Sequence, residues 1–454
     1  MVVDHIRDLP RAMKHGSDGA FDPEQVRPDF VPTDDYTSIE FARLENEKVW
    51  LKVWLIAARE QQFGKTGDFV RFDIGAESIV IVQREDGSLG AFYNVCQHRG
   101  RRLVDAPSGN LGDHFFCRYH AWRYELDGSP RYIHHQDDWN DCATFNPDQV
   151  GLKGLRLDTW GGWVWVSMDP DIKPLGEYLA PAPELLEAFE FQNLSITWYK
   201  TVRVKCSWKT AIEAFVEAYH VAGTHPQTMR GVSGGGNKAP ATRVRDHTVI
   251  RIDRNTRRVA PGPNASDPRQ RMLESVREQA ETLQALVTDH YLRAAERMAT
   301  EVPPDADLGK ELRRLHREEM ELAGARWPAG LSDELIKEAG DTWHIFPNTV
   351  LLASYNGALW YRSRPDAKDP EACLFDIWWL GRHPPGQEPP IQHDVYESPQ
   401  LFGDSNAFLA QDFGNIEEVQ QGMNSRGLAA ARTNPVQEVA VSHLHEVLRR
   451  YINS

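Results

Sequence analysis

Two short pairs of cysteine and histidine constrain this chain more than any other feature. The first pair is Cys96-Gln97-His98, and the second is Cys117-Arg118-Tyr119-His120, eighteen residues further on. Both pairs lie at the ends of runs rich in Val, Phe and Tyr, so two hairpin tips would present them to one point. Two thiolates and two imidazoles in that arrangement predict a four-ligand site for zinc or for an iron–sulfur cluster.

The order of the ligands separates these two possibilities. A zinc finger usually keeps its two cysteines together and its two histidines together. A Rieske [2Fe–2S] cluster instead has two cysteines on one iron and two histidines on the other. Because each pair here contains one residue of each type, within a segment of β-type runs, the pattern favours a Rieske cluster over a structural zinc site.

The local residue patterns along the chain predict two domains of different kinds. Short β-type runs separated by turn signals extend from about residue 67 to 168 and predict a small all-β domain. Charged helical sequence follows over about 267–323, before the strand-like runs Thr349–Ser354, Leu359–Arg362 and Leu374–Leu380 and a closing helix at Glu438–Tyr451. We therefore expect an α+β fold, in which the small domain precedes a larger, helix-grip-like domain with an antiparallel sheet flanked by helices.

Composition and charge exclude several functions. The formal net charge of −15 at pH 7 argues against a nucleic-acid groove. No run approaches the roughly 18 apolar residues of a membrane span, and Asp4, Arg7 and Asp8 interrupt any secretory signal. Five cysteines, an odd and sparse number, argue for a reducing compartment rather than a disulfide framework. We expect a cytoplasmic protein.

The two ligand pairs and their neighbours resemble the Rieske domain in the large (alpha) subunits of ring-hydroxylating oxygenases. The matching segments are Cys96-Gln97-His98-Arg99-Gly100 and Cys117-Arg118-Tyr119-His120-Ala121-Trp122-Arg123-Tyr124, followed by Asp127-Gly128. The resemblance implies that Cys96, His98, Cys117 and His120 hold the [2Fe–2S] cluster. Ala121 stands where the family often has Gly, so we expect a backbone without left-handed dihedrals there.

Five arginines surround the two pairs in a chain that is acidic as a whole. They would form an electropositive patch that docks an acidic electron donor. The alternative is local pairing with Asp105, Asp113 or Glu125, and the two interpretations are compatible. The arginines are Arg99, Arg101, Arg102, Arg118 and Arg123.

A second constellation lies about a hundred residues downstream. We expect a helix over Ser207–Val221, with Ser207 as its N-cap and His220 in its last turn. Gly223 then lets the chain turn so that His225 faces the same point. Two imidazoles with one carboxylate form the facial triad of non-haem Fe(II) oxygenases, whereas an isolated histidine pair more often belongs to a core or a surface.

This stretch also resembles the catalytic domain of the same family. The matching residues are Trp208-Lys209, Glu213-Ala214-Phe215, Glu217-Ala218-Tyr219-His220 and Thr224-His225. The segment Gln411-Asp412-Phe413-Gly414-Asn415-Ile416-Glu417 resembles the distal acid motif. The resemblance implies a mononuclear Fe(II) held by His220, His225 and Asp412. Asp412 would otherwise be a helix cap, and the weaker ligand candidates are Asp404, Glu417 and Glu418.

The resemblance assigns a role to Glu217 as well. In most members an Asp at this place bridges a Rieske histidine of one subunit and an iron histidine of the next, here His120 and His220, and Glu217 is one methylene longer. The alternative is a glutamate that only orients His220. A path between subunits implies an assembly, α3 or α3β3 with a small subunit. It also implies O2 as the co-substrate, and a reductase, with or without a ferredoxin, that delivers electrons from NAD(P)H.

The residues beside the predicted ligands are mostly apolar, which favours a hydrophobic, aromatic substrate, although some of them would simply be core. The candidate pocket residues are Phe215, Ala218, Val221, Leu352, Phe408 and Leu409. The loop Gly231–Gly236 and the helical insert would cover its mouth. The reaction implied is dihydroxylation, monohydroxylation or oxidative N- or O-dealkylation. A glutamate at the bridge is reminiscent of demethylating members, so a demethylase of a small alkylamine or quaternary ammonium compound is the alternative.

Three hypotheses follow. In the first, residues 1–55 are an arm and a helix of the catalytic domain, 56–170 the Rieske domain, and 171–454 the catalytic iron domain with an insert at about 267–325. This oxygenase (an oxidoreductase that incorporates oxygen from O2) would act in aromatic hydrocarbon catabolism. In the second, the chain is a Rieske electron-transfer protein without its own catalytic iron. In the third, it is a zinc-binding interaction module.

Overall fold

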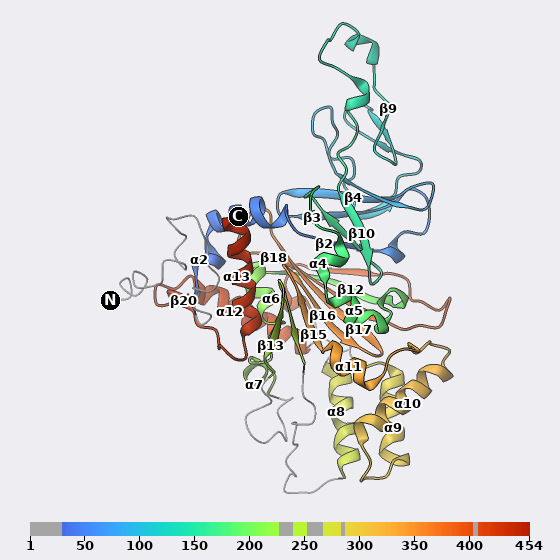
Figure 1. The fold of residues 1–454 in the computed structure, drawn as a ribbon, viewed down its shortest axis with the longest axis vertical. Helices are drawn as coiled ribbons and strands as arrows, with labels where there is room; N and C mark the ends of the chain where they lie inside the picture. The colour runs from blue at the N-terminus through green and yellow to red at the C-terminus, as the bar shows by residue number, and fades with distance from the viewer. Residues whose placement is uncertain (1–29, 227–238, 252–266, 283–286, 403–406) are drawn as a thin grey trace. The chain divides into compact units, whose positions relative to one another are not determined.

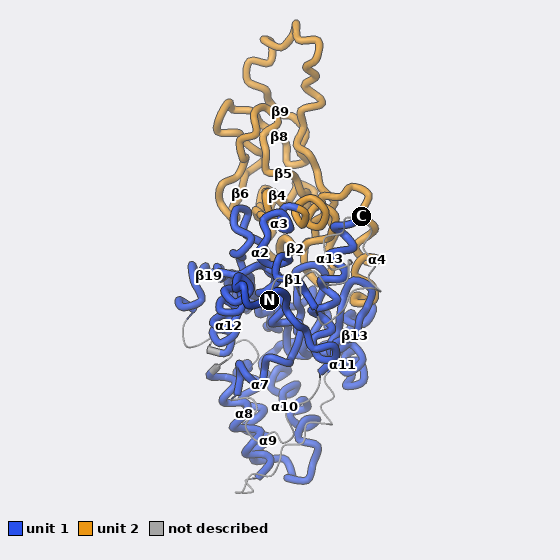
Figure 2. The backbone as a smooth tube through the Cα atoms, turned by 90° about the vertical axis from the view of Figure 1, so that its left-hand side faces the viewer, with its two compact units in different colours: residues 1–43, 184–454 blue, residues 44–183 orange. Residues whose placement is uncertain are grey.

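The chain folds into two compact units. The computed structural model describes residues 30–226, 239–251, 267–282, 287–402 and 407–454. One unit, here called the small unit, comprises Leu44–Pro183, and the large unit comprises the chain up to Arg43 together with Glu184–Ser454 (Figure 2). Since each unit has its own sheets and core, the two are described separately.

The small unit is built from short antiparallel strands. Its sheets have the strand orders β10-β11-β2, β5-β4-β3-β6 and β7-β8-β9. The strands are β2 (Leu55–Arg59), β3 (Asp68–Ile74), β4 (Glu77–Gln83), β5 (Leu89–Tyr93), β6 (Ser108–Asn110), β7 (His114–Phe116), β8 (Arg123–Glu125), β9 (Pro130–Tyr132), β10 (Arg156–Trp160) and β11 (Trp163–Ser167). The β-branched and aromatic residues of these runs fill one core that also contains Cys96 and Cys117.

The large unit is organised around one eight-stranded sheet with the order β13-β14-β15-β16-β17-β18-β12-β19 (Figure 1). All neighbours are antiparallel except β12 and β19, which run parallel. The strands are β12 (Ser195–Val204), β13 (Ala241–Val244), β14 (His247–Ile250), β15 (Thr342–Ile345), β16 (Thr349–Ser354), β17 (Gly357–Pro365), β18 (Cys373–Gly381) and β19 (His393–Tyr396). The predicted α+β class is confirmed.

The two faces of this sheet differ in chemistry. Side chains alternate along a strand, so Tyr361 and Phe375 share the face on which α6 (Trp208–Glu213) packs. On the opposite face Asp376 is fully buried and accepts from Arg362 and Arg364. The face toward α6 is therefore aromatic, and the opposite face is tied together by buried ion pairs.

The large unit also contains several helices besides α6. They are α2 (Asp34–Thr37), α3 (Ile39–Glu45), α7 (Val221–Thr224), α8 (Pro268–Thr282), α9 (Asp289–Glu301), α10 (Leu308–Leu322), α11 (Asp333–Ala339), α12 (Ala407–Met423) and α13 (Val439–Asn453). The helices α8 to α10 share a core of their own, where charged helical sequence was expected. Among the described residues, no helix combines the length and apolar character that a membrane span requires.

Two predicted helices end earlier than expected. The helix expected over Ser207–Val221 stops at Glu213, and α7 begins only at Val221. The reason is local: the Glu217 carboxylate accepts from the backbone N–H groups of Tyr219 and His220, an alternative to helical hydrogen bonds. Similarly, the helix expected at the end of residues 1–55 stops at Trp50, and Leu55 opens β2.

Candidate metal centres

The two Cys-His pairs lie in loops with the same backbone pattern. In the first loop, Gly100 N–H donates to the Cys96 carbonyl at 2.9 Å, and Cys96 N–H donates to the Arg101 carbonyl at 2.8 Å. In the second, Ala121 N–H donates to the Cys117 carbonyl at 3.0 Å, and Cys117 N–H donates to the Trp122 carbonyl at 2.8 Å. Each loop therefore turns four residues after its cysteine.

That turn has a left-handed residue in both loops. Gly100 has a φ of 75° and Ala121 a φ of 59°. The expectation that Ala121 avoids left-handed dihedrals is wrong, because the hydrogen-bonded loop requires this conformation irrespective of the residue. An L-residue there costs about 1–2 kcal/mol relative to an ordinary conformation.

The cysteines are buried against Tyr124. Their exposed fractions are 2% for Cys96 and 1% for Cys117. The Tyr124 hydroxyl lies 3.2 Å from Cys96 Sγ and accepts from Gln97 N–H at 3.0 Å. Burial raises the pKa of the Cys96 thiol, although Tyr124 acts in the opposite direction. A metal centre would supply the positive charge that a buried thiolate needs.

The two histidines approach each other from the two loops. The rings of His98 and His120 are 4.5 Å apart and nearly perpendicular, and His98 stacks on Trp122 at 5.0 Å. The Nδ1 atoms of both histidines are buried without a hydrogen-bond partner among the described residues. Two orphaned imidazole nitrogens beside two buried thiols fit a cluster in which two cysteines hold one iron and two histidines hold the other.

The arginines around these loops have different partners. Arg101 pairs with Asp105 at 2.6 Å, as local pairing predicts. Arg99 lies over the Tyr119 ring and Arg123 over the Phe116 and Tyr132 rings. Asp113 and Glu125 pair instead with Arg131, at 2.8 and 3.5 Å.

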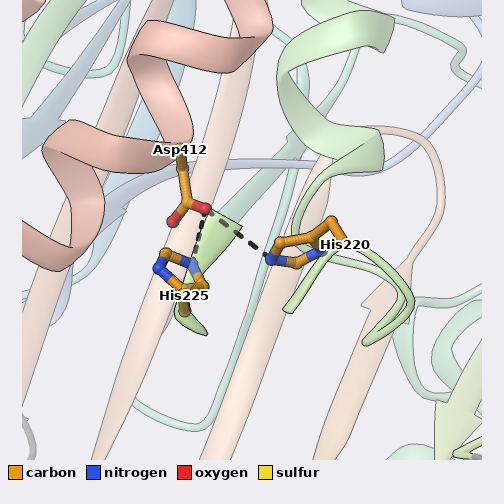
Figure 3. A group of neighbouring side chains, drawn as sticks. All are labelled: His220, His225 and Asp412. Atoms are coloured by element: carbon orange, nitrogen blue, oxygen red, sulfur yellow. Dashed lines mark ion pairs between the residues drawn. The ribbon is translucent and has the colours of Figure 1, made fainter. Parts of the chain in front are cut away.

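The second centre brings together His220, His225 and Asp412. One ligand atom from each lies within 4.8 Å of the others, and all three side chains point at one spot (Figure 3). Asp412 Oδ1 is 2.8 Å from His225 Nε2 and 3.6 Å from His220 Nε2. Asp412 is the sixth residue of α12, so it does not cap that helix.

Each histidine of this triad is oriented by a second side chain. Glu217 Oε1 is 2.8 Å from His220 Nδ1, and Gln411 Oε1 is 2.8 Å from His225 Nδ1. An Nδ1–H that donates to such an acceptor leaves Nε2 with its lone pair directed at the metal. Asn415 of α12 also donates to Thr224 Oγ1 at 3.0 Å. The contacts of Gln411 with His225 and of Asn415 with Thr224 therefore connect the end of α7 to α12, before and after Asp412 in the sequence.

The chemistry of the donor set fits non-haem iron(II). His225 and Asp412 are buried at 0% and 3% side-chain exposure, and His220 is 24% exposed. Burial lowers the pKa of His220, but Glu217 and Asp412 outweigh it and raise the pKa overall. Two imidazoles and one carboxylate are the donor set of the facial triad expected from the sequence, and they would hold such an iron.

The six candidate pocket residues have different surroundings. Phe408 stacks on the His225 ring at 3.6 Å. Phe215 packs against Tyr361 and Phe375 at 4.6 and 4.8 Å, within the aromatic face of the sheet. The remaining four are the half-buried Ala218, Val221 and Leu352 and the buried Leu409.

The other carboxylates considered as ligands lie elsewhere. Glu417 accepts from Lys205 N–H at 3.1 Å, and Glu418 is exposed. Asp404 and the loop Gly231–Gly236 lie outside the described residues. Sequence reasoning gave no role to Gln411, although it precedes the predicted ligand Asp412 and that adjacency is the signal that would have found it.

Comparison with known proteins agrees with both centres. The family model "Ring hydroxylating alpha subunit (catalytic domain)" matches residues 191–454, and the model "Rieske [2Fe-2S] domain" matches residues 53–146.

Two curated relatives have names that give a quaternary ammonium compound, carnitine or glycine betaine, as the substrate of a monooxygenase. A carnitine monooxygenase oxygenase subunit of Escherichia coli is 33% identical over 43% of this chain and 52% of its own length. A glycine betaine monooxygenase oxygenase subunit of Pseudomonas aeruginosa is 29% identical over 44% of this chain and 46% of its own. The chain thus spans about half the length of these relatives.

A solved structure has a similar fold. Naphthalene 1,2-dioxygenase with indole bound superposes with a TM-score of 0.66 at 18% identity, over 94% of this chain and 92% of that one. At this identity the likeness concerns the fold alone.

Proposed function

Because this chain belongs to the family of ring-hydroxylating alpha subunits and carries a Rieske domain before its catalytic domain, we propose that it is the terminal oxygenase component of a multicomponent Rieske non-haem iron oxygenase. The reaction is the O2- and NAD(P)H-dependent oxidation of a small molecule. The main observation behind this proposal is that one ligand atom each of His220, His225 and Asp412 lies within 4.8 Å of the others. A facial triad binds a catalytic iron, which a protein that only transfers electrons does not require.

Each residue of the two centres has a task in this proposal. Cys96, His98, Cys117 and His120 hold the cluster, and His220, His225 and Asp412 hold the iron. The cluster supplies single electrons, and the iron supplies dioxygen chemistry. Glu217 and Gln411 keep the two imidazoles in the tautomer that ligates through Nε2. The aromatic face around Phe215 and the Phe408 ring exclude water and orient the substrate.

Electron transfer calls for partners and an assembly. We propose that Glu217 connects His220 to His120 of a neighbouring subunit in an α3 ring, with or without a small subunit. A reductase, alone or with a ferredoxin, delivers the electrons, docking near the arginines of the cluster loops. The domain division at residues 55/56 and 170/171, with an insert at about 267–325, belongs to this proposal. The odd and sparse number of cysteines supports a cytoplasmic location.

Two substrate classes fit the site, and a specific observation supports each. The aromatic rings of Phe215, Tyr361 and Phe408 favour a hydrophobic, aromatic substrate, as in aromatic hydrocarbon catabolism. The names of the two curated relatives favour a quaternary ammonium compound, which aromatic faces also accommodate by cation–π attraction. Dihydroxylation or monohydroxylation belongs to the first class and oxidative demethylation to the second.

The test is turnover by the cluster- and iron-loaded protein with a surrogate reductase under labelled O2. The panel contains carnitine, glycine betaine, naphthalene and benzene. A demethylase releases formaldehyde from the first two compounds, whereas a ring hydroxylase places label in products of the last two. Loaded protein that consumes no O2 with any reductant, with or without substrate, contradicts the proposed function.

A further inference from the structure

A buried network of charged side chains ends on α6, the helix that precedes the turn containing Glu217 and His220. Glu213 is the last residue of α6, four residues before Glu217. Behind it lie Asp35 of α2 and His445 and Arg449 of α13, with side-chain exposures of 0%, 3% and 7%. The helices α2, α6 and α13 carry these residues, and Figure 1 shows the helices close together. No role in binding iron or substrate explains so many buried charges.

His445 joins the two acids of this network. Its Nε2 is 2.6 Å from Glu213 Oε1, and its Nδ1 is 3.3 Å from Asp35 Oδ2. Each ring nitrogen faces a carboxylate oxygen, which is the arrangement that an imidazolium with a proton on both nitrogens satisfies. Arg449 donates to Asp35 Oδ2 at 2.6 Å. Two cations then balance two buried anions, and loss of either cation leaves an uncompensated charge.

The network fixes Glu213 on both of its oxygens. The Tyr36 hydroxyl donates to Glu213 Oε2 at 3.0 Å, opposite the His445 contact. At the other end of α6, Gln420 of α12 accepts from Ser207 N–H at 2.9 Å and from the Thr210 hydroxyl at 2.8 Å. Helix α6 is therefore held at both ends by side chains from other helices.

A short path connects this anchor to a metal ligand. Three residues separate Glu213 from Glu217, and the ring of Phe215 among them is packed against Tyr361 and Phe375. Glu217 then contacts His220 through both its ring Nδ1 and its backbone N–H. A displacement of Glu213 would shift the start of this turn and, with it, the position of His220 Nε2.

We propose that His445 is a positioning residue of the iron site: by clamping Glu213 and Asp35 together, it fixes the end of α6 from which the Glu217–His220 turn starts. This inference rests on the proposed function, since it concerns the iron that His220 would hold. His445 touches neither metal nor substrate, and it acts only through Glu213.

The test measures Fe(II) affinity of the catalytic site in cluster-loaded protein by competition with a chelator. The variant is His445→Gln, which retains hydrogen-bonding atoms but not the charge. The matched control is His443→Gln on the same helix, because the His443 ring hydrogen-bonds to the Arg245 carbonyl at 2.8 Å and to neither acid of the network. We expect His445→Gln to weaken Fe(II) binding by about tenfold, the lower end for supporting residues of metal sites, and the control to change it by less than about twofold.

A double-mutant cycle identifies the route. If His445 acts through Glu213, Glu213→Gln weakens Fe(II) binding in the wild type but adds little in the His445→Gln background. Additive effects would show that the two residues act independently and would overturn the proposed route.

The cluster spectrum and the unfolding midpoint distinguish positioning from a merely structural role. Folded His445→Gln protein that has a lower midpoint but wild-type Fe(II) affinity overturns the inference. If this variant does not fold, Tyr36→Phe removes one hydrogen bond from the same carboxylate, and unchanged Fe(II) affinity in that variant overturns the inference equally. Wild-type protein that binds no catalytic Fe(II) refutes the proposed function itself, and the inference with it.

Discussion

The two proposed metal centres are built in opposite ways. The cluster ligands and their support, including Tyr124, lie within 29 consecutive positions, and each ligand loop closes on its own backbone. The iron ligands come from two segments almost two hundred positions apart, and their support includes Asp35 near the start of the described chain and His445 near its end. One centre is local, and the other depends on the packing of the whole large unit.

This difference predicts how each centre responds to damage. A local centre tolerates changes elsewhere in the chain, because its geometry is fixed by hydrogen bonds within two loops. A centre assembled from distant segments weakens whenever a contact between helices is lost. Variants of the iron site should therefore leave the cluster intact, and variants in the ligand loops should leave the iron triad intact.

The largest effect is expected from His225→Ala. Loss of one of three iron ligands should abolish turnover and reduce the iron content from about three to about two per chain. Metal analysis and visible spectroscopy check this, because the brown cluster spectrum should remain. Loss of the spectrum together with the catalytic iron would show that the two centres are not separate.

A smaller effect is expected from Gln411→Leu. The leucine cannot accept from His225 Nδ1, so the ring loses the partner that sets its tautomer. We expect Fe(II) affinity to fall by about tenfold, with the cluster spectrum unchanged. Exposed Glu418→Gln, seven residues and about two helical turns further along α12, is the control and should bind Fe(II) as the wild type does. Equal affinity of Gln411→Leu and wild type would refute the orienting role.

The contacts of His445 with Glu213 and Asp35 make the stability of the large unit depend on pH. Burial lowers the pKa of His445, but Glu213 and Asp35 outweigh burial and raise it above its ordinary value of 6.5. Of the described ionisable groups, Tyr36 hydrogen-bonds to Glu213, Arg449 pairs with Asp35, and Glu438 and the Cys206 thiol interact electrostatically with Glu213. A raised folded-state pKa contributes stability that is fully present below about pH 6.5 and is lost as the pH rises through the folded-state value.

Urea unfolding of the wild type and of His445→Gln at about pH 6 and pH 9 checks this dependence. The free energy of unfolding should fall more between these pH values in the wild type than in the variant. Parallel losses in both proteins would show that His445 is not held as an imidazolium.

The smallest effects are expected in the ligand loops. Ala121→Gly relieves a left-handed alanine and should stabilise the small unit by about 0.5–1 kcal/mol, after the entropic cost of glycine. Gly100→Ala, the reverse substitution at the equivalent position of the other loop, is the control. A Cβ there would contact only Val95 Cγ2, at 3.9 Å, so the loss of stability would come from the backbone conformation. It should destabilise by about 0.5–1 kcal/mol, because the reduced entropic cost of alanine offsets part of the left-handed strain. Thermal unfolding measures both, and changes of the same sign would contradict the equivalence of the loops.

How much could be predicted from the sequence follows the same division. The strands around the cluster and its four ligand candidates were evident, because alternation and residue spacing are local signals. The break after Glu213 was not, because a carboxylate that accepts from its own backbone looks like any other helical glutamate. The ten-residue strand β12 and the helix α12 around Asp412 were also missed.

The network behind the iron site could not be predicted at all. His445 lies on a helix whose residues suggest only a closing, amphipathic segment. Its partners Asp35 and Glu213 are 410 and 232 positions away. Nothing in the spacing of these residues indicates that folding brings them together, because their contact is fixed by how α2, α6 and α13 pack.

The central claim is that one chain holds two chemically different iron centres. Quantifying iron and acid-labile sulfide in anaerobically reconstituted protein tests it most directly. We predict about three irons and two sulfides per chain, two irons in the cluster and one in the triad. Two irons and two sulfides, with His220, His225 and Asp412 intact, would contradict the claim and leave a Rieske electron-transfer protein.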